Sequence, residues 1–141
     1  MSVPFAEVIG DPVAQSKSPL IHKHWLQLLD IEGDYLRTRV ETADLGAFLA
    51  ERRADPDWRG CNVTVPHKEA VVRLLDELDE SAATVGAVNC VVPRSGRLVG
   101  YNTDVDGVAA ALCSISATRS VTHSRRKRVI RIACCTAKRS P

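Results

Sequence analysis

Residues 60–68, with the sequence GCNVTVPHK, decide the fold because they join a strand pattern to a helix pattern. The first six favour a strand, and Pro66 ends the run since proline cannot donate a hydrogen bond within a sheet. A strand that passes through a polar loop into a helix is the repeating unit of α/β proteins. Apolar side chains then recur at helical spacing, which predicts an inward face of Val71, Leu74, Leu75 and Leu78.

The same alternation continues on both sides of this stretch. An apolar run over residues 5–9 predicts a strand, and Ser18 and Pro19 predict a helix start with Ser18 as its N-cap. Thr42 is expected to cap a second helix. The expected inward faces of these two helices are Leu20, Ile21, Trp25, Leu28 and Leu29, and then Leu45, Phe48 and Leu49.

Further strands are expected over residues 35–40, 88–93 and 97–101, and a last helix over residues 104–112. The last two strands are separated by a turn at residues 95–96, which predicts a hairpin. The expected fold class is therefore α/β, with a mostly parallel sheet flanked by helices.

Composition excludes several classes of protein. The chain has 141 residues, 45% of them hydrophobic and 26% charged, which is typical of a single soluble domain. No apolar run approaches the roughly 20 residues that span a bilayer, and the N-terminus lacks the pattern of a secretory signal. The five cysteines are an odd number without a C-x-x-C pair, which argues against a disulfide scaffold. We therefore expect a cytoplasmic protein.

Charge divides the chain near residue 112. Residues 1–112 hold all 17 acidic side chains, whereas residues 113–141 hold 8 Lys and Arg and no acid or glycine. We expect residues 1–112 to form one domain and residues 113–141 to be a disordered basic tail. One hypothesis is that this tail is an out-of-frame reading of a lost second domain, and its rival is a genuine basic interaction tail. The basic run at residues 125–128 has no aromatic partners, which argues against a nucleic-acid site.

Four short segments carry more polar residues than a strand–helix connection requires. They are residues 16–19 (SKSP), 62–68 (NVTVPHK), 86–89 (GAVN) and 102–104 (NTD). Ligands of open α/β sheets bind outside the carboxyl ends of the strands, where such loops meet. Together these segments would form a pocket of hydroxyls, amides, one ammonium and one carboxylate, which suits a small polyhydroxylated ligand.

The four motifs together resemble the substrate-binding domain of shikimate dehydrogenase, and the resemblance covers residues 5–112. That family reduces 3-dehydroshikimate to shikimate with NADPH, in the chorismate pathway to the aromatic amino acids. The resemblance implies that Ser16 and Ser18 hold the substrate carboxylate and that Thr64 and Asn89 bind the substrate. It also implies that Lys68 and Asp104 act at the reacting hydroxyl, with Lys68 as the acid–base group, while Glu80 falls near a position linked to the cofactor side.

General chemistry agrees with the roles of the lysine and the carboxylate. Hydride transfer to a ketone leaves an alkoxide, which Lys68 could protonate while Asp104 holds the ammonium in place. Each residue also has a structural interpretation. Ser18 and Asp104 could simply cap helices, Asn89 could be a turn amide, and a lone lysine is usually a solvated surface residue.

The NADP-binding half of the family has no counterpart in the sequence. None of the eight glycines lies two residues from another, so no G-x-G phosphate loop exists. We expect this chain alone to be inactive, and we expect no metal site, because the calcium-like start at residues 102–107 ends on Cys113 instead of Glu. Two alternatives remain open. One is a relative that acts on quinate, and the other is a non-catalytic shikimate-binding module with a basic nucleic-acid-binding tail.

Overall fold

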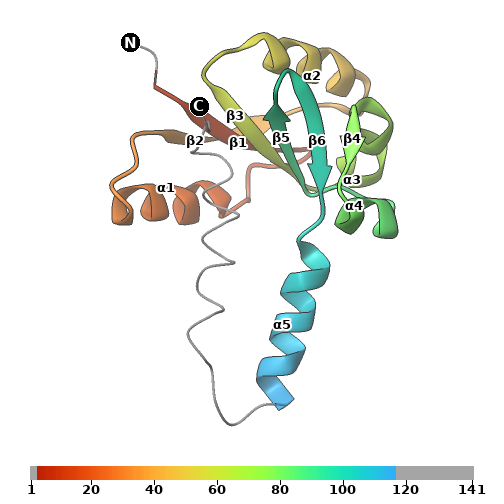
Figure 1. The fold of residues 1–141 in the computed structure, drawn as a ribbon. Coiled ribbons are helices and arrows are strands. Elements are labelled where there is room, and N and C mark those ends of the chain that lie inside the picture. Colours follow the sequence, from red (N-terminus) through yellow and green to blue (C-terminus); the bar gives the residue numbers. More distant parts are fainter. Residues whose placement is uncertain (1–2, 117–141) are drawn as a thin grey trace.

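The structure is a computed structural model that describes residues 3–116, and within them six strands form one sheet in the order β2-β1-β3-β5-β6-β4 (Figure 1). Strand β1 pairs in parallel with β2 and β3, and β4 pairs in parallel with β6, whereas β5 runs antiparallel to β3 and β6. This arrangement confirms the predicted α/β class and the hairpin. The strands are β1 (Phe5–Gly10), β2 (Asp34–Arg39), β3 (Trp58–Val63), β4 (Glu77–Leu78), β5 (Cys90–Arg94) and β6 (Arg97–Tyr101).

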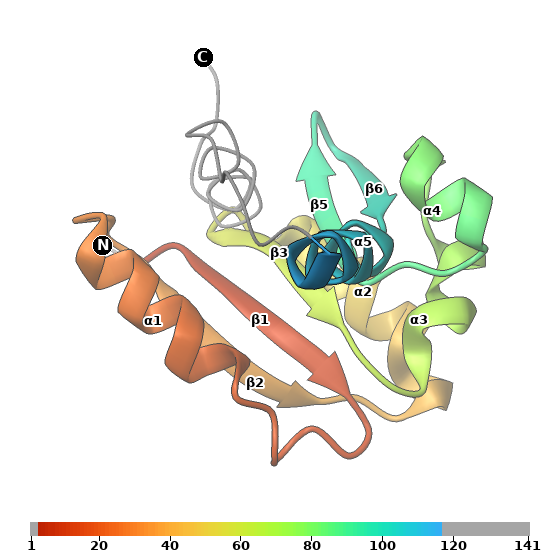
Figure 2. The same cartoon turned by 90° about the horizontal axis from the view of Figure 1, so that it is seen from below.

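Helices flank the sheet (Figure 2). Two clusters of buried side chains form the core. The larger cluster joins the sheet to α2, where Leu45 and Leu49 are buried as predicted and Phe48 packs against them. The smaller cluster consists of Ala6, Val8, Val13 and Tyr35. The helices are α1 (Ser18–Leu28), η1 (Thr42–Asp44), α2 (Leu45–Ala54), α3 (His67–Ala70), η2 (Val71–Leu74), α4 (Glu80–Val85) and α5 (Asp104–Ser116).

The start of α1 differs from the prediction. Its N-cap position is Lys17, and Ser18 is already the first helical residue, so Ser18 does not cap the helix. The hydroxyl of Ser16 instead accepts a hydrogen bond from the Ser18 amide at 3.3 Å. Thr42 is likewise no side-chain cap, because it lies inside η1.

The inward face of α1 also differs from the prediction. Pro19 is buried, and His22, Trp25 and Leu26 are partly buried. Apolar side chains occur all round this helix, so their spacing does not select the side that meets the sheet. Four of the five residues expected inside are exposed, namely Leu20 (72%), Ile21 (44%), Leu28 (71%) and Leu29 (40%).

The single helix predicted over residues 71–78 is wrong. The helix that starts at α3 tightens into η2 and ends, and residues 77–78 form β4 instead. Asp76 causes this change, since its backbone amide donates to Leu98 O (3.0 Å) and its carboxylate accepts from Leu98 N (2.6 Å). Leu75 and Leu78 still pack on the core from these positions.

Helix α5 projects away from the sheet and ends at Ser116, beyond the expected domain boundary at residue 112 (Figure 1). The tail predicted over residues 113–141 lies, from residue 117 onwards, outside the described residues. The boundary and the character of the tail therefore stay predictions. In the part of the chain that the structure describes, no helix combines the length and the apolar character that crossing a membrane requires.

Candidate functional site

A cleft of about 510 Å³ opens at the carboxyl ends of β1 and β3. Its walls come from the loop after β1, the starts of α1 and α5, the loop between β3 and α3, and the residue before β5. The structure brings all six predicted substrate-binding residues to this one cleft, which is lined by Ser16, Ser18, Thr64, Lys68, Asn89 and Asp104.

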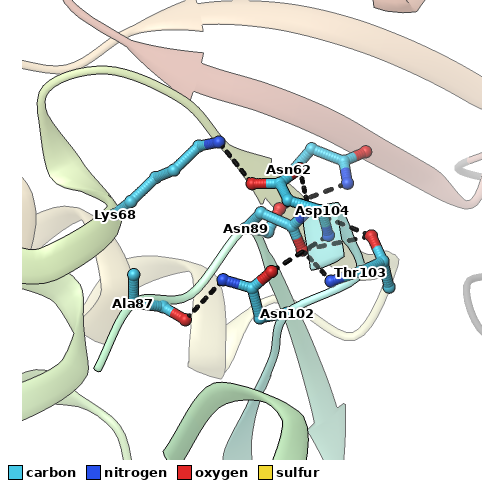
Figure 3. A network of polar contacts seen from close by, with 7 residues as sticks. All are labelled: Asn62, Lys68, Ala87, Asn89, Asn102, Thr103 and Asp104. Carbon is cyan, nitrogen blue, oxygen red and sulfur yellow. Dashed lines mark hydrogen bonds and ion pairs between the residues drawn. The ribbon is translucent and has the colours of Figure 1, made fainter. Parts of the chain in front are cut away.

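At the centre of the cleft, Lys68 and Asp104 form an ion pair. The Lys68 ammonium donates to Asp104 Oδ2 at 2.6 Å, and the Asn89 side-chain amide donates to Asp104 Oδ1 at 2.7 Å (Figure 3). Burial on its own would raise the pKa of Asp104, but the hydrogen bonds from Lys68 and Asn89 outweigh it and lower the pKa below its usual range. Asp104 is therefore a carboxylate at neutral pH. The expected approach of these two side chains is confirmed, while their catalytic role stays a prediction.

Backbone contacts hold Lys68 at the cleft. Its carbonyl oxygen accepts from the Val88 amide at 2.8 Å, which joins α3 to the segment before β5. The neighbouring His67 is fully buried, and its Nε2 lies 2.6 Å from the carbonyl oxygen of Val40, where it donates a hydrogen bond. His67 is therefore structural, and it anchors the helix that carries Lys68.

Thr64 reaches the cleft because the chain of β1 comes very close to it. The Thr64 amide donates to Ile9 O at 2.9 Å, and a side chain on Gly10 would place its Cβ 2.5 Å from Thr64 Cγ2. Only glycine fits there, so the G-D-P sequence that ends the first strand also sets the position of Thr64.

The two serines meet at the start of α1. Their hydroxyl oxygens lie 3.2 Å apart, with Ser16 donating to Ser18. The first turn of this eleven-residue helix contains no acidic side chain. A positive helix end and two hydroxyls together suit a carboxylate.

Three further polar residues, Gln15, His22 and Asn62, line the cleft without having been predicted as site residues. Asn62 accepts a hydrogen bond from the Tyr35 hydroxyl at 2.5 Å and donates to Asn89 O at 3.3 Å. His22 stacks on the Tyr35 ring at 4.0 Å, and burial lowers its pKa. Asn62 belongs to a motif that the sequence singled out, whereas nothing in the spacing of His22 distinguished it from a surface residue.

Glu80 does not join the site. It is an exposed residue in the first turn of α4 and does not line the cleft. Its link to the cofactor stays a prediction. Nor do residues 3–116 fit a dinucleotide, because no glycine-rich loop opens any of their helices. In the same residues, no cluster of three His, Cys, Asp or Glu side chains could hold a metal ion.

Comparison with known proteins points to one family. The shikimate dehydrogenase substrate binding domain matches residues 8–91. The shikimate dehydrogenase (NADP(+)) of Sphingopyxis alaskensis is 56% identical over 113 residues, which are 79% of this chain and 41% of that protein. That of an Exiguobacterium species is 49% identical, over 74% of this chain and 40% of the relative. The chain thus spans about two fifths of the length of the relatives it matches.

Two solved structures superpose on about four fifths of this chain. Shikimate 5-dehydrogenase from Thermus thermophilus, in complex with NADP(H) and shikimate, superposes with a TM-score of 0.75 and 39% identity, over 80% of this chain and 42% of that one. The ligand-free 5-ketofructose reductase of a Gluconobacter strain superposes with a TM-score of 0.76 and 30% identity, over 82% of this chain and 41% of that one.

Proposed function

The chain belongs to the shikimate dehydrogenase family through its substrate-binding domain, and on that premise we propose that it forms the substrate-recognition part of an enzyme that interconverts 3-dehydroshikimate and shikimate. The observation that carries this proposal is the cleft itself. It gathers two hydroxyls at a helix start, a threonine, an asparagine and a lysine–aspartate pair. A ring that bears one carboxylate and several hydroxyls would find a partner for each group there.

The start of α1 would bind the substrate carboxylate. The hydroxyls of Ser16 and Ser18 lie at the positive end of the helix, where they would donate to an anion. Thr64 and Asn89 line the same cleft, where they would contact the ring hydroxyls. The ring would thereby present one oxygen to Lys68.

Lys68 would move the proton of the reaction. When a ketone accepts a hydride its oxygen becomes an alkoxide, and the Lys68 ammonium can donate the proton that neutralises it. In the reverse direction the neutral amine accepts the hydroxyl proton as the hydride leaves. Asp104 orients the Lys68 side chain through its 2.6 Å contact. NADP, for which the relatives are named, supplies or accepts the hydride, and residues 3–116 contain no site that fits it.

The cofactor would be bound by a part of the enzyme that corresponds to the remaining three fifths of the relatives. Three exposed valines near the cleft, Val65, Val105 and Val108, would then be covered by that part. Without it, this chain would bind shikimate weakly and would not oxidise it, because the hydride acceptor and the exclusion of water are both missing. Incubation of the purified chain with shikimate and NADP⁺ should give no NADPH absorbance above the blank. The buried free thiol of Cys61 favours a cytoplasmic setting.

Shikimate binding can be measured directly on this chain. In a titration of the ¹⁵N-labelled chain with shikimate, we expect chemical-shift changes confined to residues of the cleft, with the largest at Ser18, Thr64 and Asn89. Quinate in a parallel titration would separate the two substrate preferences, because the tighter ligand saturates its shifts first. Shifts scattered over the surface, or none at millimolar shikimate, would contradict the proposal. The variant Asp76→Asn, which lies before β4 and does not line the cleft, serves as a folded control that should bind equally well.

A further inference from the structure

We propose that Asn102 is a positioning residue that holds the Asp104 carboxylate against Lys68 and Asn89. Asn102 lies between the end of β6 and the start of α5, and it is only 4% exposed. It does not line the cleft, so it would act through other residues and not on the substrate. The importance of Asp104 in this inference rests on the proposed function. The contacts of Asn102 described below do not depend on that function.

Both polar atoms of the Asn102 side-chain amide form hydrogen bonds. Its Nδ2 donates to the carbonyl oxygen of Ala87 at 2.9 Å, and its Oδ1 accepts from the backbone amide of Asp104 at 2.9 Å (Figure 3). One side chain thus joins the segment before β5 to the first residue of α5.

The segment before β5, which Asn102 joins to α5, also contacts the Asp104 carboxylate. Asn89 follows Ala87 by two residues and donates to Asp104 Oδ1. Val88, between them, donates its backbone amide to the carbonyl oxygen of Lys68, whose ammonium reaches Asp104 Oδ2. One of the two hydrogen bonds that orient the carboxylate therefore starts from the segment to which Asn102 binds, and the other comes from Lys68 on α3, whose backbone that segment contacts. If that connection were lost, Asp104 could move relative to both donors at once.

Asn102 is itself held from a third side. Its backbone amide donates to Ser81 Oγ at 3.1 Å, and the Ser81 hydroxyl donates to Asp79 Oδ1 at 2.7 Å. Asp79 is the N-cap of α4, so this helix start fixes the backbone of Asn102. A buried amide whose donor and acceptor are both satisfied is costly to replace, because any shorter side chain leaves at least one partner without a bond.

The test compares Asn102→Ala with a matched control in the full chain. The control is Asp76→Asn. It alters a hydrogen bond of the same kind, from the backbone amide of Leu98 to a side-chain oxygen, at the other end of β6. Two quantities are measured by NMR, the pKa of the Asp104 carboxyl from its ¹³C shift and the hydrogen-exchange rate of the Asp104 amide. Thermal unfolding is recorded for each variant, so that a general loss of stability can be separated from a local effect.

We expect Asn102→Ala to raise the pKa of Asp104 above the wild-type value, because the hydrogen bonds from Lys68 and Asn89 weaken while the burial remains. The Asp104 amide should exchange about fivefold faster, as the loss of one hydrogen bond implies. Asp76→Asn should leave both quantities unchanged. If Asn102→Ala does not fold, Asn102→Ser takes its place, and the same rise in pKa is required because serine is too short to reach Ala87.

An unchanged Asp104 pKa in the folded variant would overturn the inference, as would an equal rise in Asp76→Asn. A purely structural role for Asn102 would lower the melting temperature without moving this pKa. The titration needs no ligand, so its outcome is independent of whether shikimate binds. Failure of the inference and failure of the proposed function are therefore distinguishable.

Discussion

Replacing Lys68 by alanine should cost the domain little stability, even though it removes an ion pair of 2.6 Å. The side chains of Lys68 and Asp104 are 34% and 50% exposed, so water screens the pair and rehydrates the carboxylate once the ammonium is gone. Exposed ion pairs contribute about 0–1 kcal/mol. We expect Lys68→Ala to lower the free energy of unfolding by about 0.5 kcal/mol.

A second ion pair of nearly the same length provides the comparison. Arg52 Nε donates to Glu7 Oε1 at 2.7 Å, but the Glu7 side chain is fully buried and that of Arg52 is only 18% exposed. Glu7 also accepts a hydrogen bond from the Thr38 hydroxyl. Arg52→Ala would leave a buried carboxylate without its counter-charge, which costs about 3 to 5 kcal/mol. The Arg52 guanidinium also stacks over Phe48 at 4.9 Å, so packing is lost as well.

Urea unfolding at pH 7, followed by circular dichroism, measures both variants against the wild type. The expected result is a large shift of the midpoint for Arg52→Ala and a small one for Lys68→Ala, with similar slopes. Equal losses would refute the reasoning, because they would show that the Lys68–Asp104 pair supports the fold. A small loss of stability in Lys68→Ala is what we expect of a residue whose role lies in the reaction and not in the fold.

Three further results are expected. Because the pKa of Asp104 is lowered in the fold, its carboxylate adds stability that is present above its unfolded pKa of about 3.9 and is lost as the pH falls through the lower folded value. The stability deficit of Asp104→Asn should therefore shrink below about pH 4 in urea titrations, and a constant deficit from pH 7 to pH 2.5 would contradict this. Burial holds the pKa of His22 below its ordinary 6.5, so the fold loses stability as the pH falls below 6.5. The variant His22→Phe can keep the stack on Tyr35 without this titration. Its melting temperature should therefore fall less than that of the wild type between pH 7 and 5. Gly10→Ala should lower the free energy of unfolding by about 1–3 kcal/mol and shift the NMR resonances of Thr64, because the new Cβ would lie 2.5 Å from Thr64 Cγ2. An unperturbed spectrum would show that Gly10 and Thr64 are not so close.

The sequence could predict which residues share one cleft, because each motif lies at a recognisable place in the strand–helix pattern. The segments SKSP, NVTVPHK, GAVN and NTD lie at the junctions of strands and helices, and the rule that ligands bind beyond the strand ends brings them together. The six substrate-binding residues expected from them do line one cleft. Glu80 followed no such motif, and it lies elsewhere, on α4.

Tertiary contacts determined what the sequence could not predict. The apolar residues of α1 surround the helix, so only its docking on the sheet selects Pro19, His22 and Leu26 over Leu20 and Leu28. Residues 71–78 show helical spacing, but the bonds from Asp76 to Leu98 convert their end into a strand. Asn102 was part of a recognised motif, yet its link to Ala87 joins segments 15 residues apart and is visible only in the fold.

The most direct test of the central claim supplies the cofactor part that this chain does not span. Residues 1–116 would replace the matching segment of the Sphingopyxis relative, which is 56% identical over 113 residues, and NADPH formation from shikimate would be followed by absorbance. The account predicts turnover by this chimera and its loss in Lys68→Ala, with shikimate affinity largely retained. A folded chimera that binds shikimate and NADP⁺ without turnover, or one that keeps its rate without Lys68, would contradict it.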